Sequence, residues 1–469
     1  MRFLDEARAL LGAAHVLTPD ADDLSAYAED WRKRYLGRPL AALRPADTAQ
    51  VAALVALCAE HGVAIVPQGG NTGMCAGATP NESGQQVILL LSRLNKVRAV
   101  DPLNNTVTVE AGCVLAKVQE LAAEQDRFFP LSIGSEGSCQ IGGNIATNAG
   151  GIQVLRYGNM RDQVLGLEVV LPDGQVLNLL KGLRKDNTGY DLKHLFIGAE
   201  GTLGIITAAV LKLYPAPRAR TLALVAVASP QRALELLAVL RSHLADRVTA
   251  FEIMGDPVVA MVQKHIPGTP SLFDKRPPWY VLAQVSDSSG AEALQAAFEE
   301  ALGQALESGV AQDVIITSSV AQANELWAMR DNASAAQQRD GHNIKHDMAV
   351  PVSSVPAFID EVLPQLEKAY PGVRPVVFGH LGDGNLHFNV ARPSDWVGDW
   401  LNESDAVNAI VLDAVARYNG SFSAEHGLGM LKRHELPLYK TPLEIDLMRR
   451  IKAALDPQGL MNPGKVLPD

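Results

Sequence analysis

Three glycine-dense segments in the first half of this chain constrain its fold more than any other feature. The first spans 67–77 and follows a short apolar strand expected over 63–67. The second, 131–151, contains six glycines, and the third, 198–204, precedes an apolar run over 205–213. Such loops turn sharply and can present consecutive backbone N–H groups to a flat or anionic ligand. Together they predict a large cofactor held by loops from several parts of the chain.

The elements around these loops indicate more than one domain. An amphipathic helix is expected over 48–62, capped by Asp47 or Thr48 and ended by Gly62. After Pro217 the pattern changes to short strands that alternate with helices, which favours an α+β domain with a largely antiparallel sheet. In that region we expect strands over 221–228, 248–253, 279–285 and 314–318, and helices over 232–244 and 291–307.

Size and charge exclude several classes of protein. A chain of 469 residues suggests roughly two or three domains. The 41 Lys and Arg against 52 Asp and Glu give a net charge of −11, which disfavours nonspecific nucleic-acid binding. No apolar run approaches the roughly 18 residues of a membrane span. Because Asp5 and Glu6 stand where a signal peptide is basic, we expect a cytoplasmic protein.

Two familiar nucleotide motifs and an internal electron relay are missing from the sequence. No G-x-G-x-x-G occurs, so a Rossmann dinucleotide site lacks its fingerprint. The string Gly459 to Lys465 imitates a phosphate-binding loop, but Val466 stands where Ser or Thr should bind magnesium. The four cysteines are far apart, without iron–sulfur spacing. A redox enzyme of this kind must pass its electrons to a separate carrier.

Two histidines in the segment 376–390 predict a metal site. Asp383-Gly384 favours a two-residue hairpin turn. That register places His380 directly opposite His387, with Cβ atoms about 4.5–5.5 Å apart, close enough to share one ion. Asn389 projects to the same face.

A carboxylate and a further imidazole follow at Glu425 and His426, in a glycine-flanked turn. Two histidines and one carboxylate with open positions form a catalytic metal arrangement suited to zinc, manganese or iron. The alternative is that these histidines are ordinary surface or core residues.

A cationic patch for an acidic substrate is suggested between 324 and 350. Arg330 and Ser334 stand four residues apart on one face of an expected helix, and Lys345 lies in an alternating strand over 343–350. The alternative for an isolated helical arginine is a solvated charge.

At this point the motifs resemble a known family. The runs 67–73, 141–151 with Arg156-Tyr157-Gly158, and 184–204 look like those of FAD-linked oxidases of the vanillyl-alcohol oxidase type. Among these, the chain is most similar to the D-2-hydroxyglutarate dehydrogenases, from about 67 to 463. The resemblance implies an α+β fold with a discontinuous, two-subdomain FAD-binding domain. It assigns 1–215 to that domain, 216–420 to a substrate (cap) domain on an antiparallel sheet, and 421–469 to a C-terminal segment that completes the active site and the FAD domain.

The resemblance also implies residues for FAD, which is expected to be noncovalent because the first glycine loop offers no obvious histidine. The FAD-binding residues carried over are Pro67, Gly69, Gly70, Asn71, Thr72, Gly73, Gly77, Ser132, Gly137, Ser138, Gly142, Gly143, Asn144, Thr147, Asn148, Gly150, Gly204, Ile206 and Asn462.

The chemistry implied is oxidation of D-2-hydroxyglutarate or a related D-2-hydroxy acid to the 2-oxo acid. His380, His387 and Glu425 become ligands of one divalent ion, zinc first, with manganese, cobalt or iron as alternatives. His426 becomes the catalytic base and a substrate contact, and Arg330, Ser334, Lys345 and Asn389 contact the substrate. Ser334 stands where the family member compared has Thr.

The implied partners are a small dicarboxylic 2-hydroxy acid and a separate electron acceptor, such as an electron-transfer flavoprotein or the quinone pool. No nucleic acid is expected, and a homodimer is compatible with the family. Two alternatives remain open: a D-lactate dehydrogenase of the same family, and a metal-dependent hydrolase that uses the His-His-Glu group without flavin.

Overall fold

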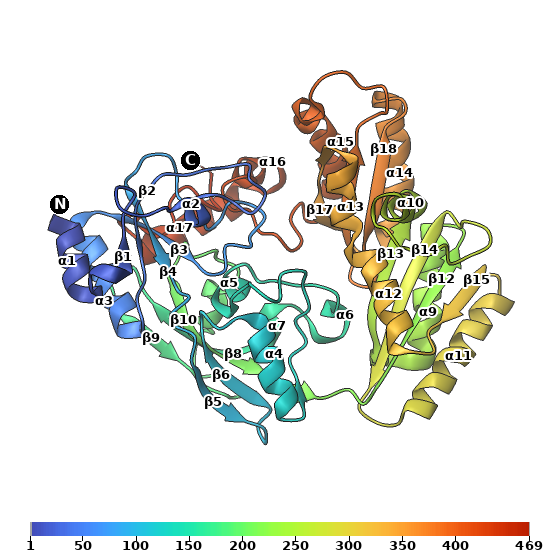
Figure 1. The fold of residues 1–469 in the computed structure, drawn as a ribbon, viewed down its shortest axis with the longest axis horizontal. Coiled ribbons are helices and arrows are strands. Elements are labelled where there is room, and N and C mark those ends of the chain that lie inside the picture. Colours follow the sequence, from blue (N-terminus) through green and yellow to red (C-terminus); the bar gives the residue numbers. More distant parts are fainter. Residues whose placement is uncertain (1, 469) are drawn as a thin grey trace. The chain divides into compact units, whose positions relative to one another are not determined.

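The structure is a computed structural model that describes residues 2–468, and its chain divides into two compact units. Unit 1 comprises the chain up to Gly150, Gly158–Ala216 and the segment from Glu425 onward, and unit 2 comprises Gly151–Tyr157 and Pro217–Ala424. In Figure 1, the red C-terminal helices α16 (Leu436–Tyr439) and α17 (Pro442–Leu455) lie among the blue N-terminal elements of unit 1. Unit 1 is therefore assembled from three separate stretches of sequence.

Unit 1 contains two main sheets and a short strand pair. One sheet has the order β1-β2-β4-β3, in which β2, β4 and β3 are parallel and β1 is antiparallel to β2. The other has the order β5-β6-β10-β8-β9 and is antiparallel throughout. The strands are β1 (Val16–Leu17), β2 (Pro39–Leu43), β3 (Ala64–Gln68), β4 (Gln86–Leu90), β5 (Val97–Asp101), β6 (Thr106–Glu110), β8 (Val164–Val170), β9 (Val176–Leu179) and β10 (Ile205–Lys212), with β7 (Arg127–Phe128) paired to β11 (Tyr214–Pro215).

Helices of unit 1 pack their apolar residues against these sheets. In α3 (Thr48–His61) the Asp47 side chain accepts a hydrogen bond from the Gln50 N–H, and Gly62 ends the helix in the left-handed region at φ 64°. Its buried residues are Val51, Leu54, Val55 and Cys58, the spacing of one helical face. The expected helix is thus confirmed to within a residue. The other helices are α1 (Arg2–Leu11), α2 (Ser25–Ala28), α4 (Leu115–Glu124), α5 (Ile141–Ala146), α7 (Met160–Gln163) and α8 (Lys193–Phe196).

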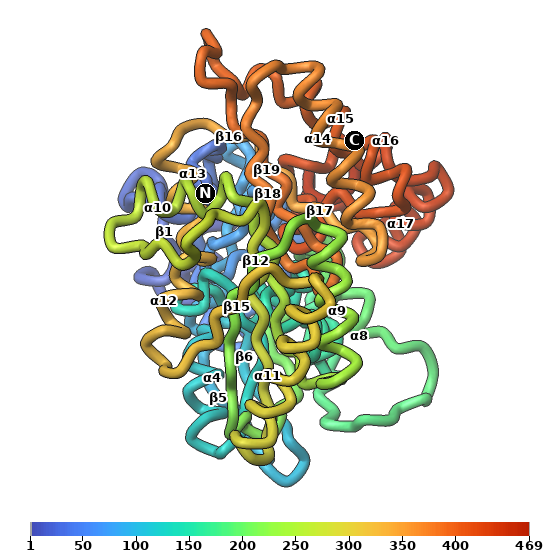
Figure 2. Tube along the Cα trace, turned by 90° about the vertical axis from the view of Figure 1, so that its right-hand side faces the viewer, coloured from blue at the N-terminus to red at the C-terminus, as the bar shows by residue number. Residues whose placement is uncertain are grey.

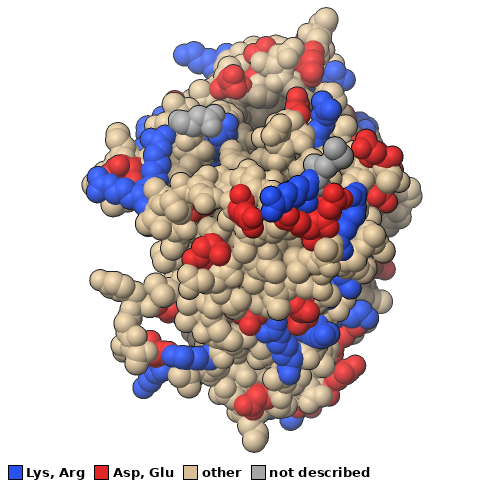
Figure 3. Space-filling view, turned by 90° about the vertical axis from the view of Figure 1, so that its left-hand side faces the viewer, with Lys and Arg blue, Asp and Glu red and all other residues tan. Residues whose placement is uncertain are grey.

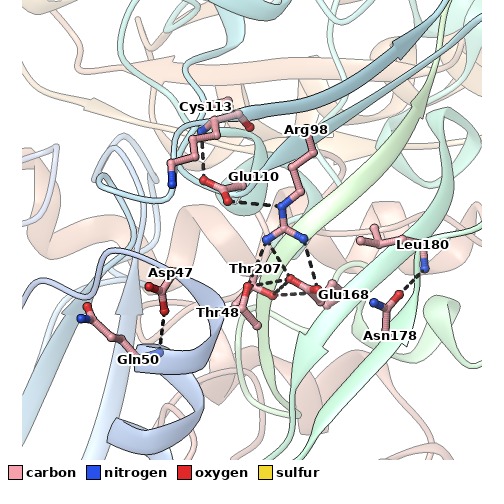
Figure 4. Close-up of polar contacts among 11 residues, drawn as sticks. Asp47, Thr48, Gln50, Arg98, Glu110, Cys113, Glu168, Asn178, Leu180 and Thr207 are labelled. Carbon is pink, nitrogen blue, oxygen red and sulfur yellow. Dashed lines mark hydrogen bonds and ion pairs between the residues drawn. The ribbon is translucent and has the colours of Figure 1, made fainter. Parts of the chain in front are cut away.

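A buried polar network ties α3 to the five-stranded sheet (Figure 4). Arg98 reaches Glu110 at 3.2 Å and Glu168 at 3.0 Å, and Glu168 also accepts from Thr48 at 2.7 Å and Thr207 at 2.9 Å. Burial raises the pKa of the Glu168 carboxyl, but these donors outweigh burial and leave its pKa below the usual value. Removing one partner would leave buried charge uncompensated, so the network fixes α3 on the sheet.

Unit 2 is built on one large antiparallel sheet. Its strand order is β15-β12-β14-β13-β18-β19-β16, with β17 also paired to β19. The strands expected from sequence correspond to β12, β13, β14 and β15 and are confirmed. The bounds are β12 (Ala219–Val227), β13 (Val248–Gly255), β14 (Trp279–Asp287), β15 (Asp313–Ile316), β16 (Asn343–Ile344), β17 (Asp347–Ala349), β18 (Arg374–His380) and β19 (Asn385–Ala391).

Helices cover both faces of this sheet. On one face α9 (Pro230–Leu244) and α11 (Ala291–Glu307) lie side by side, and both helices expected here are confirmed (Figures 1 and 2). On the other face α10 (Asp256–His265), α12 (Val320–Asp331) and α13 (Ala333–Asp340) form a core with β18 around Met254, Leu282 and Phe378. The remaining helices of the unit are α6 (Val154–Tyr157), α14 (Val355–Ala369) and α15 (Ser404–Arg417).

Three further properties concern the residues that the structure describes. No helix among these residues combines the length and apolarity needed to cross a membrane. All four cysteines are buried thiols, and none of them forms a disulfide. On the face drawn in Figure 3, basic and acidic side chains are interspersed, with a broad area between them that carries neither sign.

Candidate functional site

The glycine-dense loops of unit 1 pack directly on one another. A Cβ at Gly70 would lie 2.1 Å from the carbonyl oxygen of Ser138, so the first loop can touch the second only through glycine. In the same way, a Cβ at Gly201 would lie 2.5 Å from Cγ of Pro67, which brings the third loop onto the first. These contacts bring the backbones of the three loops together, and such a glycine-lined surface can bind a phosphate or a flat ring closely.

Unsatisfied polar atoms surround this surface. Within residues 2–468, Gln140 Oε1, Asn144 Oδ1 and Asn462 Oδ1 are buried and form no hydrogen bond. Asn462 Nδ2 donates to the carbonyl of Gly77 at 2.9 Å and to that of Glu200 at 2.8 Å, which joins the C-terminal segment to the first and third loops. Buried acceptors of this kind need donors. A cofactor with hydroxyl and ring N–H groups, such as FAD, fits them.

All residues expected to bind FAD belong to unit 1. Pro67 lies near the end of β3, and Gly69 to Gly77 form the loop after it. Gly142, Gly143 and Asn144 lie in α5, with Ser132, Gly137 and Ser138 before it and Thr147, Asn148 and Gly150 after it. Gly204 and Ile206 flank the start of β10, and Asn462 follows α17. The structure therefore brings the first, second and third loops together, while the individual contacts with FAD stay a prediction.

The histidine hairpin of unit 2 differs from the two-residue turn expected for it. His380 is paired with Asn385, and His387 with Phe378, so the loop contains four residues, 381–384. The expected register was wrong because tertiary contacts hold the loop open. Leu381 is fully buried, and the Gly382 N–H donates to the Phe251 carbonyl on β13 at 3.2 Å.

The two histidines still share one face of the sheet. His387 is two residues beyond Asn385, so it is the diagonal neighbour of His380, and the ring centroids are 5.7 Å apart. His380, His387 and Glu425 each offer one ligand atom, and these atoms lie within 4.8 Å of one another. Glu425 directly follows Ala424, whose N–H bonds the Asp347 carbonyl of β17 at 3.3 Å. Two imidazoles and a carboxylate at this spacing suit a divalent ion with open coordination positions.

Glu252, which the sequence did not single out, connects this group to Arg330. Its Oε1 accepts from His380 Nδ1 at 2.6 Å, and its Oε2 accepts from Arg330 Nε at 2.8 Å. Burial raises the pKa of the Glu252 carboxyl, but the His380 ring and the Arg330 guanidinium outweigh burial and hold that pKa well below its usual value. The one signal in the sequence was a single charged residue inside the apolar strand expected over 248–253.

Arg330 and Ser334 lie on two consecutive helices rather than on the single helix expected. The first helix, α12, ends at Asp331 and α13 begins at Ala333, with Asn332 between them at ψ −4°. Arg330 is buried and Ser334 is exposed. The interruption at Asn332 is the physical reason, because its Nδ2 bonds back to the Ala328 carbonyl at 2.8 Å. The substrate role of Ser334 stays a prediction.

Asn389 and Lys345 lie at the edge of the sheet that carries the histidines. Asn389 is buried beyond His387 on the same face, where its Nδ2 donates to Gln337 at 2.9 Å and its Oδ1 accepts from the His346 N–H at 3.2 Å. Lys345 is half-buried in the link between β16 and β17, so the strand expected over 343–350 is interrupted there. Both ends of the Asn389 amide thus form bonds within unit 2, and the substrate roles of Asn389 and Lys345 stay predictions.

The loop that contains Glu425 and His426 is anchored from its far end. Glu200, half-buried in the third glycine loop, accepts from the Leu428 and Gly429 N–H groups, both at 2.8 Å. Burial raises the pKa of Glu200 above its usual value despite these two bonds. His426 is half-buried, one residue from Glu425. Its role as general base stays a prediction.

Comparison with known proteins identifies the family. A model described as "FAD binding domain" matches residues 39–180, and one described as "FAD linked oxidases, C-terminal domain" matches residues 216–466. The chain is 40% identical over 451 residues to a D-2-hydroxyglutarate dehydrogenase of Xanthomonas citri pv. viticola, which covers 96% of this chain and 94% of the relative. It is 38% identical to the mitochondrial D-2-hydroxyglutarate dehydrogenase of Danio rerio, over 98% of this chain and 84% of the relative.

The solved structures agree with the fold. The structure of p-cresol methylhydroxylase with substrate bound matches with a TM-score of 0.77 at 17% identity, over 99% of this chain and 96% of that one. The expected vanillyl-alcohol-oxidase-type fold with an antiparallel C-terminal sheet is thereby confirmed, as is the family resemblance carried by the glycine loops. The chain belongs to the FAD-linked oxidases, and it is an FAD-dependent enzyme homologous to the D-2-hydroxyglutarate dehydrogenases.

Proposed function

We propose that this enzyme is an FAD- and divalent-metal-dependent dehydrogenase that oxidises D-2-hydroxyglutarate, or a closely related D-2-hydroxy acid, to the 2-oxo acid. The observation that carries the proposal is the His380–His387–Glu425 group, linked through one carboxylate to the cation Arg330. Relatives at 38–40% identity that are named for this activity support the choice of substrate.

The residues have distinct tasks in this proposal. When bound, FAD supplies the electron acceptor, and a divalent ion supplies a Lewis acid for the substrate hydroxyl. His380, His387 and Glu425 hold that ion, zinc by preference for two imidazoles and one carboxylate. Arg330 binds a substrate carboxylate, and His426 accepts the hydroxyl proton.

Electrons then leave through a second protein or a quinone. The chain has no iron–sulfur spacing among its four cysteines, so electron transfer must continue beyond it. An electron-transfer flavoprotein or the quinone pool is the acceptor we propose.

Substrate profiling with an artificial dye acceptor tests the choice of substrate. A charge-assisted hydrogen bond contributes about 1.5–3 kcal/mol, or about ten- to a hundredfold in discrimination. We therefore expect kcat/KM to be higher for D-2-hydroxyglutarate than for D-lactate, with D-malate between them. The Arg330→Ala substitution should reduce the ratio of kcat/KM for the dianion D-2-hydroxyglutarate to kcat/KM for the monoanion D-lactate. A wild-type preference for D-lactate would contradict the proposal and favour a D-lactate dehydrogenase.

A further inference from the structure

Glu252 occupies an unusual position for a carboxylate. Its side chain is 0% exposed, in the middle of β13, with Leu282 opposite it on β14 and His380 opposite it on β18. Met254 and Phe378 form the next pair along the same face, and both are buried. A buried charge in such apolar surroundings is costly unless it is fully paired. The fold therefore retains it through its two partners.

The first partner is a proposed metal ligand. An ionised carboxylate can only accept hydrogen bonds, so the 2.6 Å contact requires the proton of the His380 ring to be on Nδ1. Nε2 then remains the one ring nitrogen with a lone pair for a cation. Carboxylates that accept from the other nitrogen of a ligating histidine set its tautomer and orientation in this way.

The second partner is the proposed substrate cation. The bond to Glu252 uses Nε of Arg330, which leaves the two terminal nitrogens of the guanidinium as a fork. The guanidinium carbon also lies 5.2 Å from the Phe378 ring centroid, and that ring lies 5.0 Å from the His387 ring. Arg330 is thus held by a carboxylate at one edge and by an aromatic ring on one face.

We propose that Glu252 is a positioning residue that fixes His380 and Arg330 in one geometry, so that metal binding and carboxylate binding depend on the same side chain. This inference rests on the function proposed above, because both partners take their roles from it. Each oxygen of Glu252 serves one partner, so a change that spoils either bond disturbs both sites. Glu252, its two partners and Phe378 all belong to unit 2.

The Glu252→Gln variant tests this role with little change in shape. A glutamine side chain ends in one oxygen, which accepts hydrogen bonds, and one NH₂ group, which donates them. The oxygen can accept a hydrogen bond from His380 or from Arg330, but the NH₂ group then faces the N–H donor of the other residue. Loss of such an outer hydrogen-bond partner typically weakens metal binding by about 10–100-fold. We expect a loss of that size in Zn²⁺ affinity, measured on the FAD-loaded enzyme by competition with a chromophoric chelator.

Kinetics provide a second readout. At saturating Zn²⁺ the variant should raise KM for D-2-hydroxyglutarate by about tenfold, as expected for one misplaced charge-assisted contact, while kcat changes less. A role limited to folding would lower the yield or the stability and leave both the Zn²⁺ affinity and KM of the folded enzyme unchanged.

Two variants serve as controls. Glu168→Gln also neutralises a buried carboxylate paired with an arginine, but its partners Arg98, Thr48 and Thr207 all belong to unit 1, so its Zn²⁺ affinity should equal that of the wild type. Glu252→Asp keeps the charge but is one methylene shorter, so it cannot reach both donors, and its affinity should fall between wild type and Glu252→Gln. If Glu252→Gln does not fold, the Zn²⁺ affinity of Glu252→Asp still tests the proposed role.

The outcomes separate this inference from the proposed function. If Glu252→Gln binds Zn²⁺ within twofold of wild type and keeps its KM, or if Glu168→Gln loses as much affinity, the positioning role is wrong while the proposed function stands. If the wild type binds no divalent ion and turns over fully without one, the proposed metal dependence fails and this inference fails with it.

Discussion

Asp340 shows how a single charge secures α13, the helix that follows the one carrying Arg330. Its carboxylate is at the C-terminal end of α13, where the helix dipole disfavours negative charge. Three basic side chains compensate: His265 at 2.8 Å, Lys264 at 3.0 Å and Arg374 at 2.8 Å. Burial raises the pKa of Asp340, but these partners outweigh burial and hold that pKa far below its usual value. The carboxylate thereby joins α13 to α10 and β18.

Replacing this carboxylate should destabilise unit 2 in a pH-dependent way. We expect Asp340→Asn to cost about 2 kcal/mol, or roughly 4–8 °C in the thermal midpoint, at neutral pH. Because the folded pKa is depressed, the contribution is present above the unfolded pKa of about 3.9 and is lost as the pH falls further. The midpoint difference from wild type should therefore shrink as the pH falls below about 4.

The matched control for this measurement is Asp246→Asn. Asp246 is 79% exposed and its pair with Arg156 spans 3.5 Å, so the Asp246→Asn substitution should lower the free energy of unfolding by no more than about 1 kcal/mol. The thermal midpoint should therefore fall by less than it does in Asp340→Asn. Equal effects of the two substitutions at neutral pH would show that the Asp340 cluster does not stabilise the fold, and a midpoint difference that persists well below about pH 4 would contradict the depressed pKa.

Single residues also show which parts of the site could be predicted from the sequence and which could not. His380, His387 and Glu425 could be proposed as ligands because imidazoles and carboxylates in short glycine-rich segments suggest metal chemistry by their residue types alone. Glu252 could not, because its partners His380 and Arg330 are 128 and 78 residues away in the chain. A contact across that separation is determined by strand order, which no local pattern contains.

Elements with local signals were predictable, and those under tertiary control were not. The helix α3 has its cap, its apolar face and its terminal glycine within its own sequence. The hairpin of β18 and β19 offered an equally strong local signal at Asp383-Gly384, but the four-residue loop follows from the burial of Leu381 and the bond of Gly382 to β13. Tertiary contacts thus changed the turn and kept both histidines on one face.

The glycine loops yield a prediction about FAD retention. A Cβ at Gly70 would come within 2.1 Å of the Ser138 carbonyl oxygen, so Gly70→Ala must push the first loop away from the second. We expect this variant to bind FAD at least about tenfold more weakly, a loss of about 1.4 kcal/mol or more, and therefore to purify with less flavin per chain than the wild type. Flavin per chain is measured from the absorbance released on denaturation.

Gly134→Ala is the control for that variant. It lies in the second loop, but nothing stands within 4 Å of a Cβ there and its φ is not positive. It should therefore retain full flavin. If Gly70→Ala folds and keeps wild-type flavin, the contact between the two loops does not shape the FAD site.

At the level of the chain, the two units have separate hydrophobic cores. One surrounds the sheets of unit 1 and includes Met461 from the C-terminal segment, and another lies between the sheet of unit 2 and α10, α12 and α13. Composition and charge excluded classes of protein but could not assign a cofactor. The three glycine-rich loops together predicted a large cofactor, and the resemblance of their motifs to a known family identified it as FAD.

Anaerobic reduction of the bound flavin tests the proposed chemistry as a whole. The purified enzyme is mixed with D-2-hydroxyglutarate without any electron acceptor, and the oxidised-flavin absorption is followed in time. We expect bleaching with the D enantiomer, none with the L enantiomer, and none after prolonged chelation, although the chelated enzyme keeps its FAD. One divalent ion per chain should restore the reaction. A protein that holds FAD but is not bleached by the D acid, or is bleached at an unchanged rate after the ion is removed, would contradict this account.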